Sequence, residues 1–212
     1  MYKISELIKG ELCFFPELGY GFYPVPPDRP YDEDYFEKYQ KLAATDMGRE
    51  ITQSRMDLVN RHYSGELCDV GIGCGQFVES MGCYGYDVNS SGIEWLKKRN
   101  KYRDIYRAPV GALSFWDVLE HIDEPEKAVA MAKEWVFVSI PFFESAEHIT
   151  SSRHFRKDEH IHYWTHNGFI RWFSLNGFEC EEFNDSESEL GREGIRTYAF
   201  RRVRDANQIA TA

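Results

Sequence analysis

The sequence predicts a single α/β domain in which a mostly parallel β-sheet carries helices on both faces. Its 212 residues suit one domain of this kind. From residue 66 onward, short apolar runs alternate with segments of helical periodicity, which is typical of a parallel sheet with covered faces. A glycine-rich turn follows the first of these apolar runs, between a predicted strand and a predicted helix. The last two predicted strands look antiparallel.

The N-terminal part is expected to pack on this sheet as an extended segment followed by two helices. Residues 12–31 are rich in aromatic residues, glycine and proline, and their prolines exclude a long helix or a central strand. A first helix is predicted over residues 32–43. A second helix is capped by Thr45 or Asp46, with one stripe at helical spacing. That stripe consists of Met47, Ile51, Leu58 and His62.

Strands and helices alternate through the rest of the chain. Strands are predicted at residues 67–70, 84–88, 112–116, 135–140, 178–183 and 197–202. Helices are predicted at residues 76–81, from a cap at Ser90 or Ser91 to about Arg99, at residues 125–133, and from a cap at Thr165 to about Asn176. Pro141 is expected to end its strand. Residues 1–64 are therefore assigned to the N-terminal segment and helices of the same domain, 65–203 to its core, and 204–212 to a flexible tail.

The glycine-rich turn predicts a site for a cofactor that contains adenosine. Its sequence places Asp69 before Gly71, Gly73 and Gly75, and glycines let the main chain turn tightly and approach a ligand. The third glycine comes one residue too early for the GxGxxG pattern of dinucleotide enzymes. Asp69 would repel a pyrophosphate, but it suits a cofactor with a cationic sulfonium and an ammonium group. A nicotinamide-dependent oxidoreductase is therefore disfavoured.

A second acidic residue strengthens this interpretation. Asp87 ends the second predicted strand, where a carboxylate can accept hydrogen bonds from both hydroxyl groups of a ribose. Val88 follows it and is expected to lie against the same cofactor. Asp69, the glycines and Asp87 together make an ordinary turn an unlikely explanation of the pattern.

These residues resemble the motifs of class I S-adenosylmethionine-dependent methyltransferases, particularly the type-11 and type-12-like small-molecule group. The run Asp117-Val118-Leu119-Glu120-His121 and the later stretch from His160 to Thr165 are similar to further motifs of that family. The resemblance covers roughly residues 66–202. It implies a Rossmann-like, seven-stranded sheet, with S-adenosylmethionine lying across the carboxyl ends of the strands.

The resemblance also implies what the individual residues do. Asp69 and the glycines would face the methionine part of the cofactor, and Asp87 its ribose. Trp116 and Asp117 would contact the adenine or the methionine side. The loop at residues 106–109 lacks the acidic residue that commonly binds the adenine amino group.

Histidines are the candidate catalytic residues. Methyl transfer from a sulfonium is an in-line displacement that depends mainly on alignment, with a general base useful when the acceptor is protonated. His121 and His160 are candidates to orient the acceptor or to take its proton. The alternative for His121 is that, together with Glu120, it caps and packs the following helix. Three further residues are expected to form a substrate-binding wall: His162, Tyr163 and Trp164.

No metal site is expected from the spacing of the candidate ligands. His160 and His162 would face the same side of an extended segment, but the sequence shows no third ligand. The five cysteines form no CxxC pair, and their odd number argues against a disulfide framework.

Composition limits the acceptor and the location. The net charge of −10 disfavours binding to nucleic acid through phosphates, and the run after Asp117 lacks the motifs of base-methylating enzymes. No stretch approaches the roughly 20 apolar residues of a membrane span, and no signal peptide is evident. We therefore expect a cytoplasmic methyltransferase with a small-molecule acceptor. The alternatives are a non-catalytic cofactor-binding or interaction protein and a nucleic-acid-modifying methyltransferase, and the oligomeric state stays open.

Overall fold

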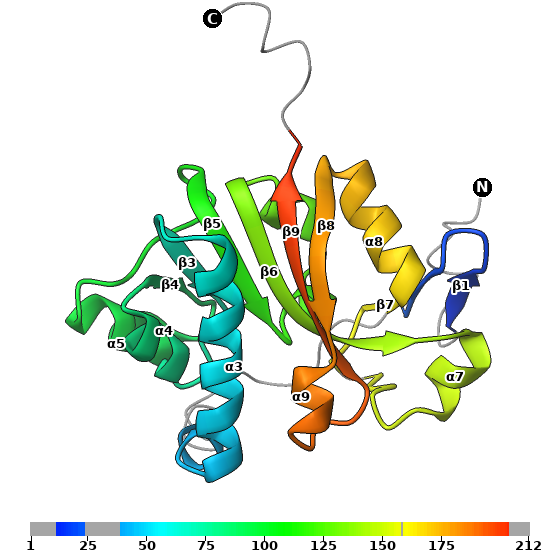
Figure 1. Cartoon of the computed structure of the whole chain (residues 1–212), viewed down its shortest axis with the longest axis horizontal. Coiled ribbons are helices and arrows are strands. Elements are labelled where there is room, and N and C mark those ends of the chain that lie inside the picture. Colours follow the sequence, from blue (N-terminus) through cyan, green and yellow to red (C-terminus); the bar gives the residue numbers. More distant parts are fainter. Residues whose placement is uncertain (1–11, 24–38, 158, 204–212) are drawn as a thin grey trace, which may run out of the picture.

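The computed structural model describes residues 12–23, 39–157 and 159–203. They form the predicted α/β fold, with a central sheet between two layers of helices. Figure 1 shows α3, α4 and α5 toward one end of the molecule and α7 and β1 toward the other. The fold class expected from the sequence is thus confirmed.

Six described strands build the central sheet, in the order β4-β3-β5-β6-β9-β8. The first four are parallel, and β9 and β8 are antiparallel to their neighbours. Where a seventh strand is expected, beside β4, the described chain makes a single parallel bridge between Gly85 and Tyr102. The six strands are β3 (Leu67–Val70), β4 (Tyr84–Tyr86), β5 (Val110–Trp116), β6 (Ala132–Phe143), β8 (Phe178–Asn184) and β9 (Ile195–Arg202).

Strand β6 does not end at Pro141, contrary to the expectation. It continues to Phe143 and changes partners at the proline. Up to Pro141 it pairs with β9, and from Phe142 it pairs with β7 (His162–Thr165), a strand that the sequence analysis missed. Proline has no N–H to donate, so it is tolerated where a strand leaves one partner for another.

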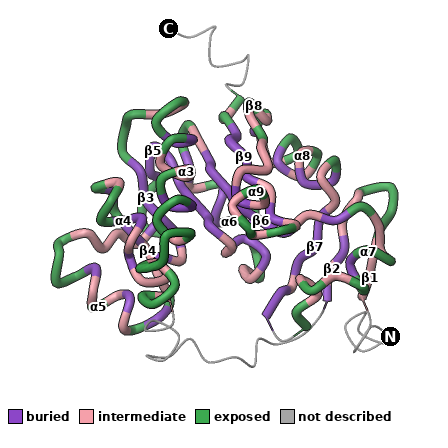
Figure 2. The backbone as a smooth tube through the Cα atoms, turned by 60° about the horizontal axis from the view of Figure 1, so that its bottom comes forward, coloured by how far each residue is buried: buried purple, intermediate pink, exposed green. Residues whose placement is uncertain are grey.

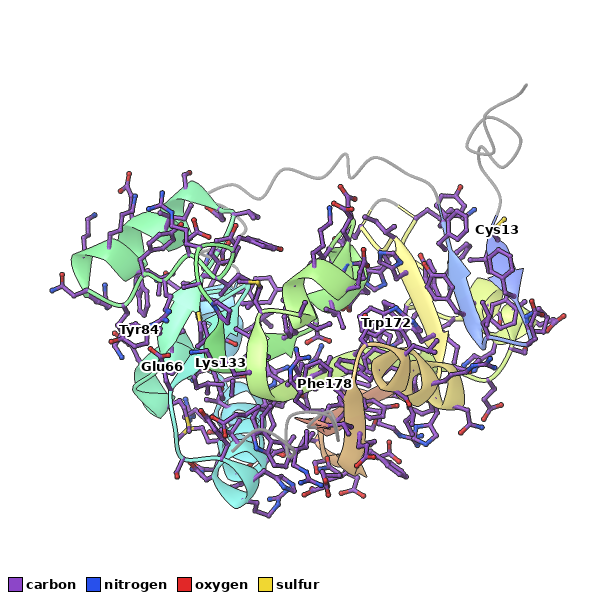
Figure 3. The ribbon with its side chains drawn as sticks, turned by 90° about the horizontal axis from the view of Figure 1, so that it is seen from above. Cys13, Glu66, Tyr84, Lys133, Trp172 and Phe178 are labelled. Carbon is purple, nitrogen blue, oxygen red and sulfur yellow. The ribbon has the colours of Figure 1, made fainter. Side chains whose placement is uncertain are left out.

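The N-terminal segment is a β-hairpin on the outer edge of β7. Strands β1 (Cys13–Phe15) and β2 (Tyr20–Phe22) pair with each other, and β2 pairs antiparallel with β7. The segment is therefore extended and packed on the core, as expected, but as part of a second sheet. Figure 3 shows Cys13 of β1 at the end of the molecule opposite Tyr84 and Glu66.

Eight helical segments have both ends within the described ranges. They are α3 (Asp46–His62), α4 (Gln76–Met81), α5 (Ser90–Lys98), the 3-10 turn η1 (Leu119–His121), α6 (Pro125–Val129), α7 (Ala146–Ser151), α8 (His166–Leu175) and α9 (Ser186–Glu189). The sequence analysis missed the short segments α7, η1 and α9, and it placed the end of α6 too late. Residues 39–43, at the end of the first predicted helix, are helical, and the rest of that helix and the tail at 204–212 lie outside the described residues.

The helix caps follow the sequence with one exception. Thr45 accepts a hydrogen bond from the Gly48 N–H at 3.1 Å at the start of α3, and Thr165 does the same for Gly168 in α8. At α5 the cap is Asn89, one residue before the predicted serines, because its side chain accepts from Ser91 N–H. In α3, the stripe residue Met47 is 45% exposed rather than buried.

Side chains alternate across the sheet and give it two cores. Leu113 and Phe115 of β5 point to the face covered by α6 and α8, whereas Ala112 and Trp116 point to the face covered by α3, α4 and α5. Figure 2 shows the buried residues concentrated on the inner strands. A sheet that is buried on both faces explains why its strands read as continuous apolar runs.

Helix α8 is held by aromatic stacking against β9, and this contact can be tested. Phe173 is fully buried, and its ring stacks on that of Phe200 with 3.7 Å between centroids. We expect Phe173→Ala to lower the free energy of unfolding by about 3–5 kcal/mol, because it leaves a cavity. Leu175→Ala in the same helix removes a side chain that is 76% exposed and should change it by less than about 0.5 kcal/mol. Urea unfolding of both variants measures the difference, and equal effects would contradict the packing described.

Candidate active site

The glycine turn after β3 is shaped by its neighbours. Gly71, Gly73 and Gly75 have φ angles of 72°, 55° and 84°, in the left-handed region that favours glycine. A Cβ atom at Gly71 would collide with the side chain of Val118, and one at Gly75 would collide with the ring of Trp95. The main chain therefore lies directly against these side chains, and only glycine fits at both positions.

The middle glycine differs from the other two. The nearest atom to a Cβ at Gly73 would be on Tyr39, 3.5 Å away. Tyr39 belongs to the helical residues 39–43 that precede α3. The ring of Tyr39 thus lies over the turn, and the N-terminal region contributes to this site.

Asp69 lies beneath the turn and is buried, with 1% of its surface exposed. Its carboxylate accepts a hydrogen bond of 2.7 Å from the hydroxyl of Ser114 on the neighbouring strand β5. Burial raises the pKa of Asp69 to about 8, and the bond from Ser114 counteracts only part of that rise. A cationic ligand above the turn would favour the ionised form and draw the pKa down.

Asp87 ties the turn to the end of β4. One carboxylate oxygen accepts from the N–H of Ile72 at 2.9 Å, and the other accepts from the N–H of Asn89 at 2.7 Å. Because a carboxylate has about four acceptor positions, each oxygen keeps capacity for a ribose hydroxyl. Burial raises the pKa of Asp87. Val88 is 72% exposed next to it, and its contact with the cofactor stays a prediction.

Trp116 lies in the core below α3. It packs edge-on against Phe77 at 5.2 Å between centroids, and the guanidinium of Arg55 lies 5.0 Å from its ring centroid. No described residue hydrogen-bonds to its buried indole Nε1. Its predicted contact with the cofactor stays a prediction.

Asp117 belongs to a partly buried ion network. Its carboxylate binds Arg192 at 2.8 Å and Arg55 at 3.2 Å, and both arginines also bind Glu187, which is fully buried. Burial alone would raise the pKa of Asp117, but Arg192 and Arg55 outweigh it and lower the pKa to about 2. Asp117 has a φ of 59°, an uncommon value for a residue other than glycine. Its contact with the cofactor also stays a prediction.

His121 and His160 lie together although 39 positions separate them in the chain. Their rings meet edge-to-face with centroids 4.7 Å apart, and Glu120 lies beside them. Burial lowers the pKa of His121 to about 4 and that of His160 to about 3, so both imidazoles are neutral at pH 7. The backbone N–H of Ile161 donates to the carbonyl of Glu120 at 2.9 Å and holds the two segments side by side.

His160 and His162 have different partners in the structure. His162 starts β7, and both of its ring nitrogens are used there. Nδ1 accepts from the Tyr20 hydroxyl at 2.7 Å, and Nε2 donates to the carbonyl of Ile122 at 2.8 Å. Tyr163 and Trp164 are fully buried between the hairpin, α7 and α8. The substrate-binding role of these three residues stays a prediction that their burial does not support.

The sequence analysis missed the charged residues that complete the site. Arg55 on α3 and Arg192 before β9 bind Asp117, and Glu187 on α9 accepts hydrogen bonds from both arginines. Ser114, the partner of Asp69, is also missed. Ser114 could have been found, because it is a polar residue within an otherwise apolar strand. The three charged residues give no such signal in the sequence, because each is typical of a solvent-exposed helix or loop.

The comparisons with known proteins place the chain in a family. A family described as "Methyltransferase domain" matches residues 34–182, which is more than half of the sequence. The chain belongs to this methyltransferase-domain family. The expected class of enzyme, an S-adenosylmethionine-dependent methyltransferase, and its expected cofactor are confirmed. No curated protein gives a significant sequence match.

Solved structures with low sequence identity share the fold. The magnesium protoporphyrin IX methyltransferase of Synechocystis PCC 6803, with bound S-adenosylhomocysteine (SAH), has a TM-score of 0.61 at 10% identity, covering 82% of this chain and 96% of that one. A possible histamine N-methyltransferase of Thermotoga maritima has a TM-score of 0.58 at 16% identity, covering 81% and 98%. The 1,6-didemethyltoxoflavin-N1-methyltransferase of Burkholderia thailandensis has a TM-score of 0.52 at 11% identity, covering 90% and 99%.

A membrane span is not found among the helices of residues 12–23, 39–157 and 159–203, since none combines the necessary length and apolarity. The cytoplasmic location stays a prediction.

The burial of Asp69 makes stability depend on pH. Its folded pKa of about 8 lies above the unfolded value of about 4, so between these pH values the folded state binds more protons. This group therefore makes the wild-type protein less stable as pH rises from about 4 to 8. We expect Asp69→Asn to avoid this loss and to melt at least about 5 °C above the wild type at pH 8.

Thermal melts of both proteins across this pH window measure the difference. The exposed Asp57→Asn on α3 serves as the control and should show no such trend. A difference for Asp69→Asn that stays constant or shrinks as pH rises would contradict the assigned burial.

Proposed function

We propose that this methyltransferase binds S-adenosylmethionine across the turn at residues 71–75 and transfers its methyl group to a small molecule. The observation that carries the proposal is the turn itself, with three left-handed glycines between the carboxylates of Asp69 and Asp87. It lies at the carboxyl ends of parallel strands, where α/β folds bind their ligands.

The charges around the turn suit the two parts of this cofactor. Asp87 supplies acceptors for the ribose hydroxyls at the end of β4, and its bond to Ile72 N–H fixes its position relative to the glycines. Asp69 supplies negative charge under the methionine part, which carries the sulfonium and the ammonium group. Tyr39 covers Gly73 from the N-terminal side and would close the site over the cofactor.

A small-molecule acceptor is supported by charge and by two structural neighbours. The net charge of −10 opposes a long contact with phosphates. The Synechocystis enzyme is named for a porphyrin, and the Burkholderia enzyme was solved with 1,6-didemethyltoxoflavin bound. We assign this chain an acceptor of the same general kind, without a choice between oxygen and nitrogen.

We infer that His121 and His160 lie on the acceptor side of the site. His121 follows β5 just beyond Val118, the residue that contacts Gly71, and His160 packs against it from the segment before β7. General bases work best with a pKa near the operating pH, and the lowered pKa values of both imidazoles make them weak bases at pH 7. We infer that they position the acceptor rather than take its proton, and that alignment supplies most of the rate.

Calorimetry with SAH and with NAD tests this function. We expect the wild-type protein to bind SAH and not NAD. Asp87→Asn should weaken SAH binding by about 10- to 100-fold, because it removes a charged acceptor for hydrogen bonds. Glu94→Gln on the exposed face of α5 is the matched control and should bind as the wild type does.

Other results of the calorimetry would contradict the proposal in different ways. Binding of NAD but not SAH would replace the proposal with an oxidoreductase, and binding of neither would favour a non-catalytic protein of this fold. SAH affinity that is unchanged in Asp87→Asn would contradict the role of Asp87 while leaving cofactor binding intact.

A further inference from the structure

A buried cluster of three side chains is left unexplained by the cofactor site. Glu120, His121 and His160 each offer one ligand atom, and these atoms all lie within 4.8 Å of one another. Glu120 and His121 belong to η1, and His160 comes from the segment before β7. Two imidazole nitrogens and a carboxylate oxygen at this spacing are the donor set of a three-ligand metal site.

The carboxylate of Glu120 is buried without a hydrogen-bond donor among the described residues, and this is the feature of the cluster that most needs an explanation. It is 1% exposed, and no described residue donates a hydrogen bond to either of its oxygens. Burying a carboxylate without partners is costly, and buried charges in proteins are normally paired or coordinate a metal ion. Arg156, four positions before His160, forms an ion pair with Glu159 at 2.8 Å instead. A cation between Glu120 and the two imidazoles would supply the missing partner.

His121 is already oriented as a metal ligand. Its Nδ1–H donates to the backbone carbonyl of Glu159 at 2.8 Å, which fixes the tautomer and leaves the lone pair on Nε2 free. Metal-bound histidines commonly donate their second ring nitrogen to a carbonyl or carboxylate in this way. The ring of His160 receives no hydrogen bond from a described residue and meets His121 edge-to-face.

Hydrogen bonds fix the backbone around the cluster. Ile161 N–H donates to the Glu120 carbonyl at 2.9 Å, and His160 N–H donates to the Arg156 carbonyl at 2.8 Å. His162, two positions on, is fixed by Tyr20 and Ile122. Rigid support of this kind keeps the three ligands in place without a bound ion, as expected of a preformed site.

We propose that Glu120, His121 and His160 bind one divalent metal ion. Two nitrogens and one carboxylate suit ions of borderline character such as Zn²⁺ or Co²⁺ better than Mg²⁺ or Ca²⁺, which prefer oxygen ligands. Three protein ligands leave a coordination position open, as in catalytic rather than structural metal sites. This inference does not depend on which acceptor is methylated.

Direct metal binding by the whole, tag-free chain tests the proposal. The protein is treated with EDTA, dialysed and titrated with Co²⁺ by visible absorption and with Zn²⁺ by calorimetry. We expect one ion per chain, and a rise in Tm of about 5–10 °C at a 100-fold excess over Kd. Glu120→Gln and His160→Gln should each weaken binding by more than about 100-fold, beyond the usual effect of changes outside the ligand set.

Two features separate a metal site from a merely structural role. Glu120→Gln keeps the shape of the side chain, so without metal it should melt at or above the wild-type temperature, while the rise caused by Zn²⁺ is lost. His148→Gln changes an exposed histidine outside the cluster and should keep full metal binding. Metal binding that survives in Glu120→Gln and His160→Gln, or no Zn²⁺ or Co²⁺ binding by the wild type, would overturn the proposal. Affinity for Mg²⁺ equal to that for Zn²⁺ would contradict the assigned class of ion.

SAH calorimetry on the same variants keeps this proposal separate from the proposed function. SAH binding that persists in Glu120→Gln shows that the variant is folded and that the cofactor site stands alone. If Zn²⁺ binds and SAH does not, the metal site is supported and the proposed function fails. If SAH binds and Zn²⁺ does not, only the metal site is overturned.

Discussion

The ion network of Arg55, Asp117, Glu187 and Arg192 is the constraint on which the carboxyl edge of the sheet depends. It joins helix α3, the turn after β5, and the α9–β9 connection, which are distant in sequence. Glu187 is fully buried with an arginine on each side. Removing one partner from such a network is costly, because it leaves an uncompensated charge in a poorly solvated place.

The network also determines the path of the chain beyond β5. Asp117 has a left-handed backbone, which the surrounding contacts maintain, including the bond from its N–H to the Ser139 carbonyl at 2.9 Å. Backbone strain of this kind persists only where neighbouring structure fixes it. The turn then presents Val118 to Gly71 and Glu120 with His121 to His160. The ion network thus positions both Val118, which contacts Gly71, and the buried cluster of Glu120, His121 and His160.

The sequence predicted those features that are local in the chain. The alternation of strands and helices, the caps at Thr45 and Thr165 and the glycine turn depend on neighbouring residues, so spacing alone revealed them. Strand β7 was missed, because its burial comes from the hairpin and α8 rather than from its own pattern. The end of β6 was wrongly predicted at Pro141 for a related reason, since only the tertiary structure shows that β6 changes partners there.

In the candidate site, too, residues close together in sequence were predicted and residues far apart in sequence were not. Asp69, the glycines and Asp87 lie close in sequence and were identified together, whereas Arg55 and Arg192, the partners of Asp117, come from helix α3 and from the loop before β9. The sequence showed no third ligand for His160 and His162, because Glu120 and His121, which lie beside His160 in the structure, come about 40 positions earlier, in the segment after β5. Only the register of β7 reveals that His162 points toward Tyr20.

The hairpin on β7 has a consequence for how the protein behaves beside other copies of itself. An uncovered β7 would offer a row of free backbone donors and acceptors to any passing strand. Strand β2 occupies that row, and β1 is the outermost strand at this edge among the described residues; it has three residues and runs into the turn that begins at Pro16. So short a strand leaves few free backbone donors and acceptors at this edge of the described residues for a strand of another molecule to pair with.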